Sequence, residues 1–222
     1  MDQPVKKRPY ISPVRHEQAA LTRRRILEAA DELFAADGYA RTTVKLIAER
    51  AHVASDTLYA VFGSKSRVLT ALIDLRLTDS TEITSELELP EAIAIRDETD
   101  QREQIALYVR FAIHGLERVG RVYAIMRSAA AVDIEMSSIL VEMQSYRAQN
   151  AKTIAGWIAK NGRLRVKKER AGEIMWALTS HELAGMLREE QGWLTEEYSA
   201  WLEDTLANAL LALPKRTGHK TP

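Results

Sequence analysis

Apolar residues recur along most of the chain at the three- to four-residue spacing of amphipathic helices, and the alternating stretches typical of strands are nearly absent. The spacing predicts helices over about 20–37, 64–87, 101–118, 121–131, 135–160, 169–190 and 195–213. Glycine or an Asn-Gly pair ends three of these stretches, at Gly38, Gly120 and Asn161-Gly162. Residues 89–100 are acidic and irregular, so we expect either a plain loop there or a loop with a short turn of helix. The predicted fold class is all-α.

Residues 41–65 follow a different pattern, because two short helical stretches are separated there by a tight break. Apolar residues line one face over 44–51, and a threonine just before it, Thr42 or Thr43, can cap the helix N-terminus. The second stretch, 55–62, has the length of a helix that enters a DNA major groove. The pattern therefore predicts a helix-turn-helix whose second helix is the recognition helix.

The residues around this motif strongly resemble the DNA-binding domain of the TetR family of bacterial transcriptional regulators. The resemblance starts at ILEAADELFAADGYARTTV and continues through LIAERA, the T-L-Y-x-x-F run and SKSRVLTAL, covering about fifty consecutive residues. Three positions depart from the family pattern. Ala54 replaces a common Ser, which shifts the expected N-cap of the second helix to Ser55; His52 replaces a Gly, and Val61 a His or Tyr. These changes bear on which DNA sequence is read.

Candidate DNA contacts follow from position and from the resemblance. Thr43 can donate its hydroxyl to a phosphate, whereas Ser55, Asp56 and Thr57 occupy the exposed first turn of the recognition helix and can reach base edges. Asp56 can accept a hydrogen bond from cytosine N4, or it can simply favour the helix N-terminus. Tyr59 and Lys65 resemble the family residues that contact phosphate, although partial burial is the alternative for Tyr59.

Charge is concentrated at the N-terminal end, although the formal net charge of the chain is zero. Residues 1–65 carry 11 Lys or Arg against 8 Asp or Glu, and DNA affinity depends on such local charge. Arg24 lies near the start of the first helix, where a cation is unfavourable unless it contacts phosphate or an acidic side chain. Lys7 and Arg8 lie in a Pro-rich segment, which is either a solvated tail or an arm for the minor groove.

These patterns predict four segments. They are a flexible basic arm (1–19), a helix-turn-helix DNA-binding domain (20–66), a helical effector-binding and dimerisation domain (67–213) and a disordered tail (214–222). The roles of the third segment are those that the resemblance to the TetR family implies.

An effector pocket is implied among the middle helices, and its candidate lining consists of aromatic, Met, His and Arg side chains. They are Tyr108, Phe111, His114, Tyr123, Met126, Arg127, Trp157, Trp176 and His181. Each can equally be a core residue, and Arg127 can equally lie on the surface. Such a mixture would suit a small, largely apolar effector with one or two polar groups.

A homodimer is implied through the last two helices, since two recognition helices must meet successive major-groove faces of a near-palindrome. The interface candidates are Trp176, Leu183, Leu187, Tyr198, Trp201, Leu202, Leu206 and Leu210. Helix 169–190 is apolar on more than one face, which predicts burial on two sides.

Other functions have little support in the sequence. The chain has no Cys, no apolar run long enough to span a bilayer and no apolar signal-peptide core, so we expect a cytoplasmic, nucleoid-associated protein. No catalytic or metal-binding motif appears, and Ser180-His181-Glu182 is a local run rather than a triad, so no enzyme activity and no cofactor are expected. The function predicted is a repressor that a small-molecule effector releases from double-stranded DNA. The alternative is a TetR-like regulator without a small-molecule effector, controlled by a protein or acting as an activator.

Overall fold

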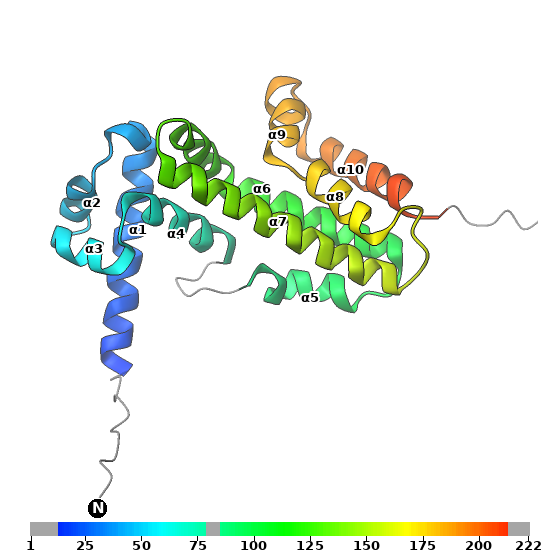
Figure 1. Ribbon diagram of the computed structural model, residues 1–222, viewed down its shortest axis with the longest axis horizontal. Coiled ribbons are helices and arrows are strands. Elements are labelled where there is room, and N and C mark those ends of the chain that lie inside the picture. Colours follow the sequence, from blue (N-terminus) through cyan, green and yellow to red (C-terminus); the bar gives the residue numbers. More distant parts are fainter. Residues whose placement is uncertain (1–12, 79–84, 213–222) are drawn as a thin grey trace, which may run out of the picture. The chain divides into compact units, whose positions relative to one another are not determined.

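The computed structural model describes residues 13–78 and 85–212. Helices are the regular elements of these ranges, apart from an isolated bridge between Leu164 and Leu211 (Figure 1), so the all-α prediction is confirmed. The described residues form two compact units. The first unit ends at Leu75, and the second holds Arg76–Thr78 and the described residues from 85 onward.

The bounds of the helices are as follows. The first unit contains α1 (Pro13–Arg41), α2 (Val44–Arg50), α3 (Ser55–Phe62) and α4 (Lys65–Thr78), the last three residues of α4 belonging to the second unit. The second unit continues with η1 (Glu86–Glu88), α5 (Pro90–Asp97), α6 (Gln101–Ala130), α7 (Ile134–Lys160), α8 (Lys168–Leu178), α9 (His181–Ala184), the π-helical η2 (Gly185–Glu190) and α10 (Thr195–Leu210).

The first unit is built on α1, which begins at Pro13 and so extends the expected helix by two turns. Proline suits the first turn of a helix, where its missing N–H is no loss. Gly38 interrupts α1 with φ 73°, at the position expected to end the helix, because glycine adopts positive φ without steric cost. All four helices contribute buried side chains, among them Phe34, Ile47, Leu58 and Leu69, and α2 packs against α1 and α3.

The turn between α2 and α3 shows how the chain accommodates its departures from the family pattern. Thr43 caps α2 as expected, its Oγ1 accepting from Leu46 N at 3.2 Å. His52 takes the left-handed conformation with φ 55°, which glycine adopts more readily. The expectation that Ser55 caps α3 is wrong, because the N-cap is Ala54 and makes no side-chain capping bond. Gly63 ends α3 with φ 82°.

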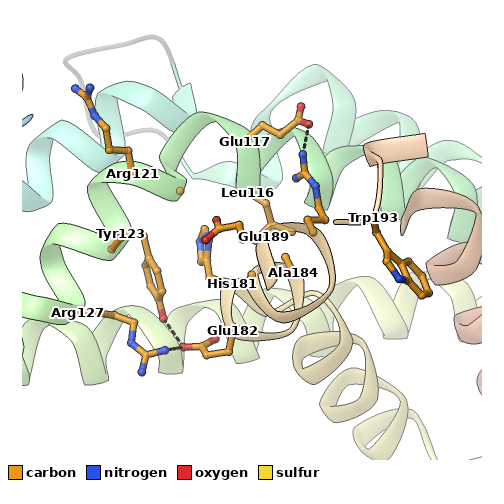
Figure 2. A pocket seen from close by; sticks show the side chains of 14 residues that line it. Leu116, Glu117, Arg121, Tyr123, Arg127, His181, Glu182, Ala184, Glu189 and Trp193 are labelled. Atoms are coloured by element: carbon orange, nitrogen blue, oxygen red, sulfur yellow. Dashed lines mark hydrogen bonds and ion pairs between the residues drawn. The ribbon is translucent and has the colours of Figure 1, made fainter. Parts of the chain in front are cut away.

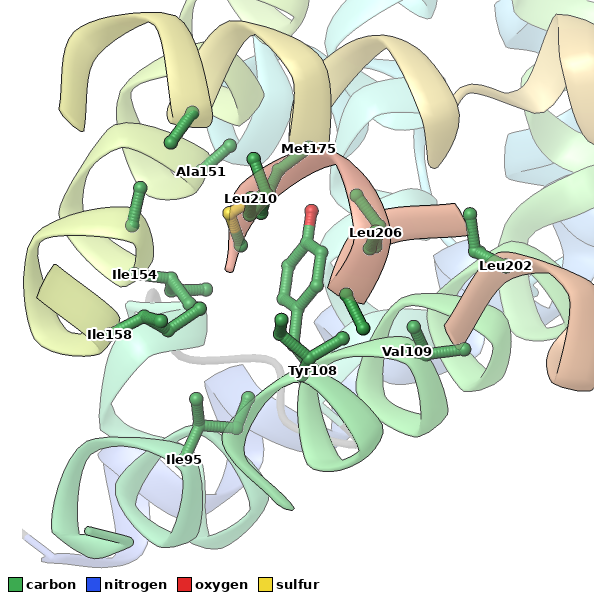
Figure 3. Packing of buried hydrophobic residues seen from close by; sticks show 14 of the residues in the cluster. Ile95, Tyr108, Val109, Ala151, Ile154, Ile158, Met175, Leu202, Leu206 and Leu210 are labelled. Carbon is green, nitrogen blue, oxygen red and sulfur yellow. The ribbon is translucent and has the colours of Figure 1, made fainter. Parts of the chain in front are cut away.

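The second unit has its core between α6, α7, α8 and α10, with α5 packed against α6 and α7 (Figures 1 and 3). Fully buried side chains come from each element, among them Ile95, Val109, Ile154, Met175 and Leu206. Figure 3 shows Tyr108 in the middle of this cluster. Its hydroxyl pairs with Thr179 Oγ1 at 3.1 Å, so the one polar atom of the ring has a partner inside the core.

Three expected helix boundaries are wrong. Helix α6 runs unbroken through Gly120, since one glycine costs a helix only about 1 kcal/mol and apolar burial continues on both sides of it. The stretch 169–190 is broken at Thr179-Ser180, where Thr179 ends α8 and the Ser180 hydroxyl caps α9 by accepting from Leu183 N. The region 89–100, expected to be a loop with at most a short turn of helix, is largely the eight-residue helix α5, which starts with Pro90 and buries Ala92 and Ile95.

Helix α4 also ends earlier than expected, at Thr78, and the segment 79–84 lies outside the described residues. The predicted tail (214–222) and residues 1–12 of the predicted arm lie outside the described residues. For residues 13–19 the prediction of a flexible arm is wrong, because they form the first two turns of α1.

Candidate functional site

The recognition helix α3 packs one apolar face in the first unit and leaves the other face exposed to solvent. Leu58 is fully buried and Phe62 nearly so, and the Arg23 guanidinium lies over the Phe62 ring at 4.5 Å, which holds α3 against α1. On the opposite side Asp56 and Tyr59 are exposed, spaced three residues apart and therefore on the same face. The described structure thus leaves these two predicted contact residues accessible.

The remaining hydroxyls predicted to contact DNA lie close to this face. Ser55 and Thr57 are half-buried in the first turn of α3, and Thr43 is exposed at the start of α2. Because the Thr43 oxygen accepts a hydrogen bond from Leu46 N, its hydroxyl proton can still be donated to a phosphate. DNA contact by these residues stays a prediction.

Lys65 has a structural task in the first unit. Its ammonium donates to the carbonyl oxygens of Tyr39 at 2.8 Å and Thr42 at 2.9 Å, and it lies 3.9 Å from the centre of the Tyr39 ring. The Tyr39 hydroxyl in turn bonds Ser66 Oγ at 2.7 Å. Lys65 therefore joins the start of α4 to the end of α1, and the predicted phosphate contact would use what donor capacity remains.

The basic residues predicted at the N-terminal end are only partly described. Arg24 is exposed on α1, and its Nε lies 3.2 Å from Glu28 Oε1, a surface ion pair worth at most about 1 kcal/mol. Such a pair can rearrange at little cost when a phosphate approaches. Lys7 and Arg8 lie outside the described residues.

A pocket of about 650 Å³ lies in the second unit between α6 and the segment formed by α9, η2 and Trp193 (Figure 2). Its lining combines three arginines and three glutamates with a few apolar and aromatic groups. The residues are Leu116, Glu117, Gly120, Arg121, Tyr123, Ala124, Arg127, His181, Glu182, Ala184, Gly185, Arg188, Glu189 and Trp193.

The structure brings three of the nine predicted pocket residues together, Tyr123, Arg127 and His181. The other six do not line this pocket. Tyr108 and Met126 are buried, Phe111, Trp157 and Trp176 pack against the core from the side, and His114 is exposed. The sequence had left a core position as the alternative for each of these residues, since an aromatic or Met side chain on a helix is more often a packing residue.

Glu182 is the centre of a hydrogen-bonded group at one end of the pocket. Figure 2 shows Tyr123 and Arg127 directed at its carboxylate, with the Tyr123 hydroxyl donating at 3.1 Å and Arg127 Nη1 at 2.5 Å. The Tyr123 hydroxyl also accepts from Gln144, whose Oε1 accepts from Arg147. Burial, and then the nearby Glu182 charge, raises the pKa of Tyr123 to about 12, so the phenol stays protonated and donates.

His181 stacks on the Tyr123 ring with the ring centres 3.9 Å apart. Burial, followed by the positive charges of Arg147 and Arg127, lowers the pKa of His181 to about 4, although Glu182 opposes this. His181 is therefore neutral near pH 7 and presents an uncharged aromatic face to the pocket.

The shift of His181 predicts a loss of stability in mild acid. In the unfolded chain the imidazole takes up a proton below about pH 6.5, whereas in the folded protein it stays neutral down to about pH 4. Stability is thus complete above pH 6.5 and falls as the pH drops towards 4, by about 2 kcal/mol after allowance for partial exposure. Tryptophan fluorescence during urea unfolding at pH 7 and pH 4.5 would measure this, since all four tryptophans lie in the second unit. Between pH 7 and pH 4.5, His181→Gln should lose less of its free energy of unfolding than the wild type does. Equal losses in the two proteins would contradict the prediction.

The predicted dimer residues divide into two sets. Tyr198, Leu202, Leu206 and Leu210 are fully buried against α6 and α8 within the chain itself, so they are not surface groups of a single chain. Trp176, Leu183, Leu187 and Trp201 keep part of their surface exposed and remain candidates for an interface.

Sequence reasoning missed eleven residues of the pocket lining, including Glu117, Arg121 and Arg188. Glu117, Arg121 and Arg127 lie on one face of α6 together with Gly120, a spacing that is visible only if the helix is read as continuous. The expected break at Gly120 hid it. Arg188 and Glu117 form an ion pair at 3.2 Å across the pocket, and no sequence pattern links them.

In the part of the chain that the structure describes, no group of three or more His, Asp or Glu side chains is placed to hold a metal ion. The helices found in residues 13–78 and 85–212 include none that is long and apolar enough to cross a membrane.

The comparisons with known proteins agree with this arrangement. Residues 26–72 match the family of bacterial regulatory proteins named tetR. No curated protein matches the chain. Many solved structures share the fold, and three of them serve as examples. NalD of Pseudomonas aeruginosa, the secondary repressor of the MexAB-OprM multidrug efflux pump, is 18% identical, with 86% of this chain and 96% of NalD covered at a TM-score of 0.60. A putative transcriptional regulator from Saccharomonospora viridis in complex with choline is 18% identical, with 86% of this chain and 98% of that chain covered at a TM-score of 0.62. FadR from Bacillus subtilis in complex with stearoyl-CoA is 17% identical, with 82% of this chain and 95% of that chain covered at a TM-score of 0.60.

These structures are similar to the chain in fold alone at such identities, whereas the match over residues 26–72 covers the helix-turn-helix itself, from α1 into α4. Together with the exposed recognition helix, that match identifies residues 26–72 as a DNA-binding domain of the TetR family of bacterial regulatory proteins.

Proposed function

We propose that the protein is a repressor that binds a near-palindromic operator as a homodimer and is released by a small-molecule effector. The observation that carries the proposal is α3, which belongs to a TetR-family helix-turn-helix and exposes the face that carries Asp56 and Tyr59. NalD, which is similar in fold, is a repressor, and this supports the same role here.

The pocket beside α6 is the proposed effector site. Choline and stearoyl-CoA are bound by two proteins of similar fold, which supports a ligand in the helical domain. The pocket carries ion pairs Arg127–Glu182 and Arg188–Glu117 on its walls. We therefore propose an effector with at least one charged or hydrogen-bonding group, more polar than the sequence suggested. A regulator without such an effector remains the alternative, and titration calorimetry with polar and apolar candidate ligands would distinguish them.

The proposed dimer places two α3 helices on one operator. Its interface would use the partly exposed Trp176, Leu183, Leu187 and Trp201 of α8, α9, η2 and α10. Isologous contact through one such surface gives the two-fold symmetry that a palindrome requires. A monomeric mass in sedimentation at micromolar concentration would refute it.

Release would follow by linkage between the pocket and the operator. Helix α4 belongs to both units, so a change in the second unit that tilts α4 would alter the separation of the two recognition helices. An effector that favours the released state weakens DNA binding by the same factor as DNA weakens effector binding. Reciprocal titrations measure both factors.

One experiment tests both the proposed operator and the proposed contact of Tyr59 with the DNA phosphate backbone. Selection of bound DNA from a random pool across a salt series should enrich a near-palindrome. On that DNA, Tyr59→Phe should weaken binding of the dimer about 30-fold, because each of its two α3 helices loses one hydroxyl-to-phosphate hydrogen bond worth about 1 kcal/mol. Other DNA sequences should lose affinity by a similar factor. Tyr146→Phe, which changes an exposed tyrosine of the second unit, is the control and should leave affinity unchanged. Sequence-independent binding only would refute the proposal.

A further inference from the structure

The recognition helix α3 has an unusual set of side chains for reading bases. Its sequence, SDTLYAVF, contains no Lys, Arg, His, Asn or Gln. Guanine is normally read by Arg or Lys and adenine by Asn or Gln, each through two hydrogen bonds. Neither pairing is available from α3, so its readout depends on hydroxyls, methyl groups and the carboxylate of Asp56.

Asp56 is placed to act on a partner outside the chain. It is exposed in the first turn of α3, on the same side as the exposed Tyr59 and Ala60. Among the residues that the structure describes, none forms a hydrogen bond or an ion pair with its side chain. The cap of α3 does not use it either, since the N-cap is Ala54 and has no side-chain bond.

A carboxylate on the DNA-facing side of a helix weakens binding to most DNA sequences and thereby favours the few that offer it a hydrogen-bond donor. DNA phosphates repel it in every complex, so it weakens binding at sequences that give it no partner. At a base edge that offers a donor, the same carboxylate gains a hydrogen bond. The group therefore separates one sequence from the rest through both effects.

The chemistry of the major groove selects one base. Guanine offers two acceptors there and thymine an acceptor and a methyl group, and both repel a carboxylate or leave it unpaired. Adenine offers an amino donor next to the N7 acceptor, which the carboxylate cannot satisfy. Cytosine offers its N4 amino group with no acceptor beside it on the same base.

We propose that Asp56 is a specificity-determining residue that accepts a hydrogen bond from the N4 amino group of a cytosine in each operator half-site. This inference rests on the proposed function, because it requires that α3 enters the major groove of a specific operator. It assigns a base to a position where the family resemblance gives none.

Selection from a random DNA pool with the wild type, Asp56→Asn and Asp37→Asn tests it. Asp37→Asn makes the same change of charge at an exposed residue of α1. The wild type should enrich a cytosine at one position of each half-site. Asp56→Asn should change that position to adenine, since an amide satisfies both N6 and N7, and should bind the original operator about 5- to 50-fold more weakly. Asp37→Asn should select the wild-type sequence.

A second measurement isolates the proposed hydrogen bond. The proposed cytosine of one half-site is replaced by 2-pyrimidinone, which lacks the 4-amino group, and binding of the wild type and Asp56→Ala is compared. The wild type should lose about 5-fold in affinity, and Asp56→Ala should lose nothing further. If the wild type selects an operator but Asp56→Asn selects the same one, the cytosine contact is overturned while the regulator stands. If the wild type selects no sequence, both are overturned.

Discussion

Gly172→Ala is expected to destabilise the second unit by about 3 kcal/mol, at the upper end of what overpacking costs. Gly172 lies in α8 where this helix crosses α7, and an added Cβ would stand 2.7 Å from both Cα and Cγ of Lys152 and 3.0 Å from its backbone nitrogen. Carbon atoms pack at about 3.5–4.0 Å. Because the Lys152 Cα and nitrogen belong to the backbone of α7, no rotamer change can make room, and the two helices must separate.

The measurement is urea unfolding followed by tryptophan fluorescence, which reports the second unit because Trp157, Trp176, Trp193 and Trp201 all lie in it. Gly156→Ala is the matched control. Gly156 lies in α7 with nothing within 4 Å of its added Cβ, so alanine should stabilise the helix by about 0.5–1 kcal/mol. Opposite signs for the two substitutions are expected. Equal shifts, or a neutral Gly172→Ala, would show that α7 and α8 do not approach each other this closely.

The contrast between these glycines marks where sequence reasoning stops. Periodicity predicted α7 and most of α8, because apolar residues such as Ile154 and Met175 repeat with the helical spacing. It could not tell Gly172, which permits a close helix crossing, from Gly156, which faces open space, or from Gly120, which was taken for a break. The difference depends on which backbone lies opposite each residue, and that is a property of the tertiary packing.

The DNA-binding face and the pocket were predictable to different degrees, because only the pocket depends on tertiary packing. The DNA-binding candidates Asp56 and Tyr59 follow from a local pattern, since a buried Leu58 fixes which side of α3 is exposed. The pocket is assembled from α6 and from α9–η2, whose start depends on the break at Thr179-Ser180. That break is stabilised by Arg147, which donates to the Thr179 carbonyl at 2.9 Å from 32 residues earlier in the chain. No local pattern contains such a contact.

The carboxylate and arginine pairs of the pocket show a further limit. Arg188 meets Glu117 across 71 positions of sequence, and Arg127 meets Glu182 across 55. The local sequence around each of these four residues predicts only a charged side chain on the solvent face of a helix. Their pairing across the pocket walls is what makes the proposed effector site polar, and it appears only once α6 faces α9 and η2.

Lys65→Ala is expected to lower the free energy of unfolding of the first unit by about 3 kcal/mol, although Lys65 was predicted from the family resemblance as a DNA contact. The substitution removes two charged hydrogen bonds, to the carbonyls of Tyr39 and Thr42, and the ammonium over the Tyr39 ring. It leaves two partly buried carbonyl oxygens at the end of α1 without this donor. Hydrogen exchange of the amides of residues 26–72, measured by mass spectrometry, reports this unit separately from the second.

Lys45→Ala is the control, since Lys45 is an exposed lysine of α2 whose contact to Glu49 is 3.9 Å long and worth little. In Lys45→Ala the backbone amides should exchange at the wild-type rate. In Lys65→Ala the most protected amides of α1 and α3 should exchange about 100-fold faster. Unchanged exchange in Lys65→Ala would contradict the structural task. Because an unstable helix-turn-helix also binds DNA poorly, lost affinity in Lys65→Ala does not by itself demonstrate a phosphate contact. Such a contact requires that affinity falls more than the measured unfolding of residues 26–72 explains.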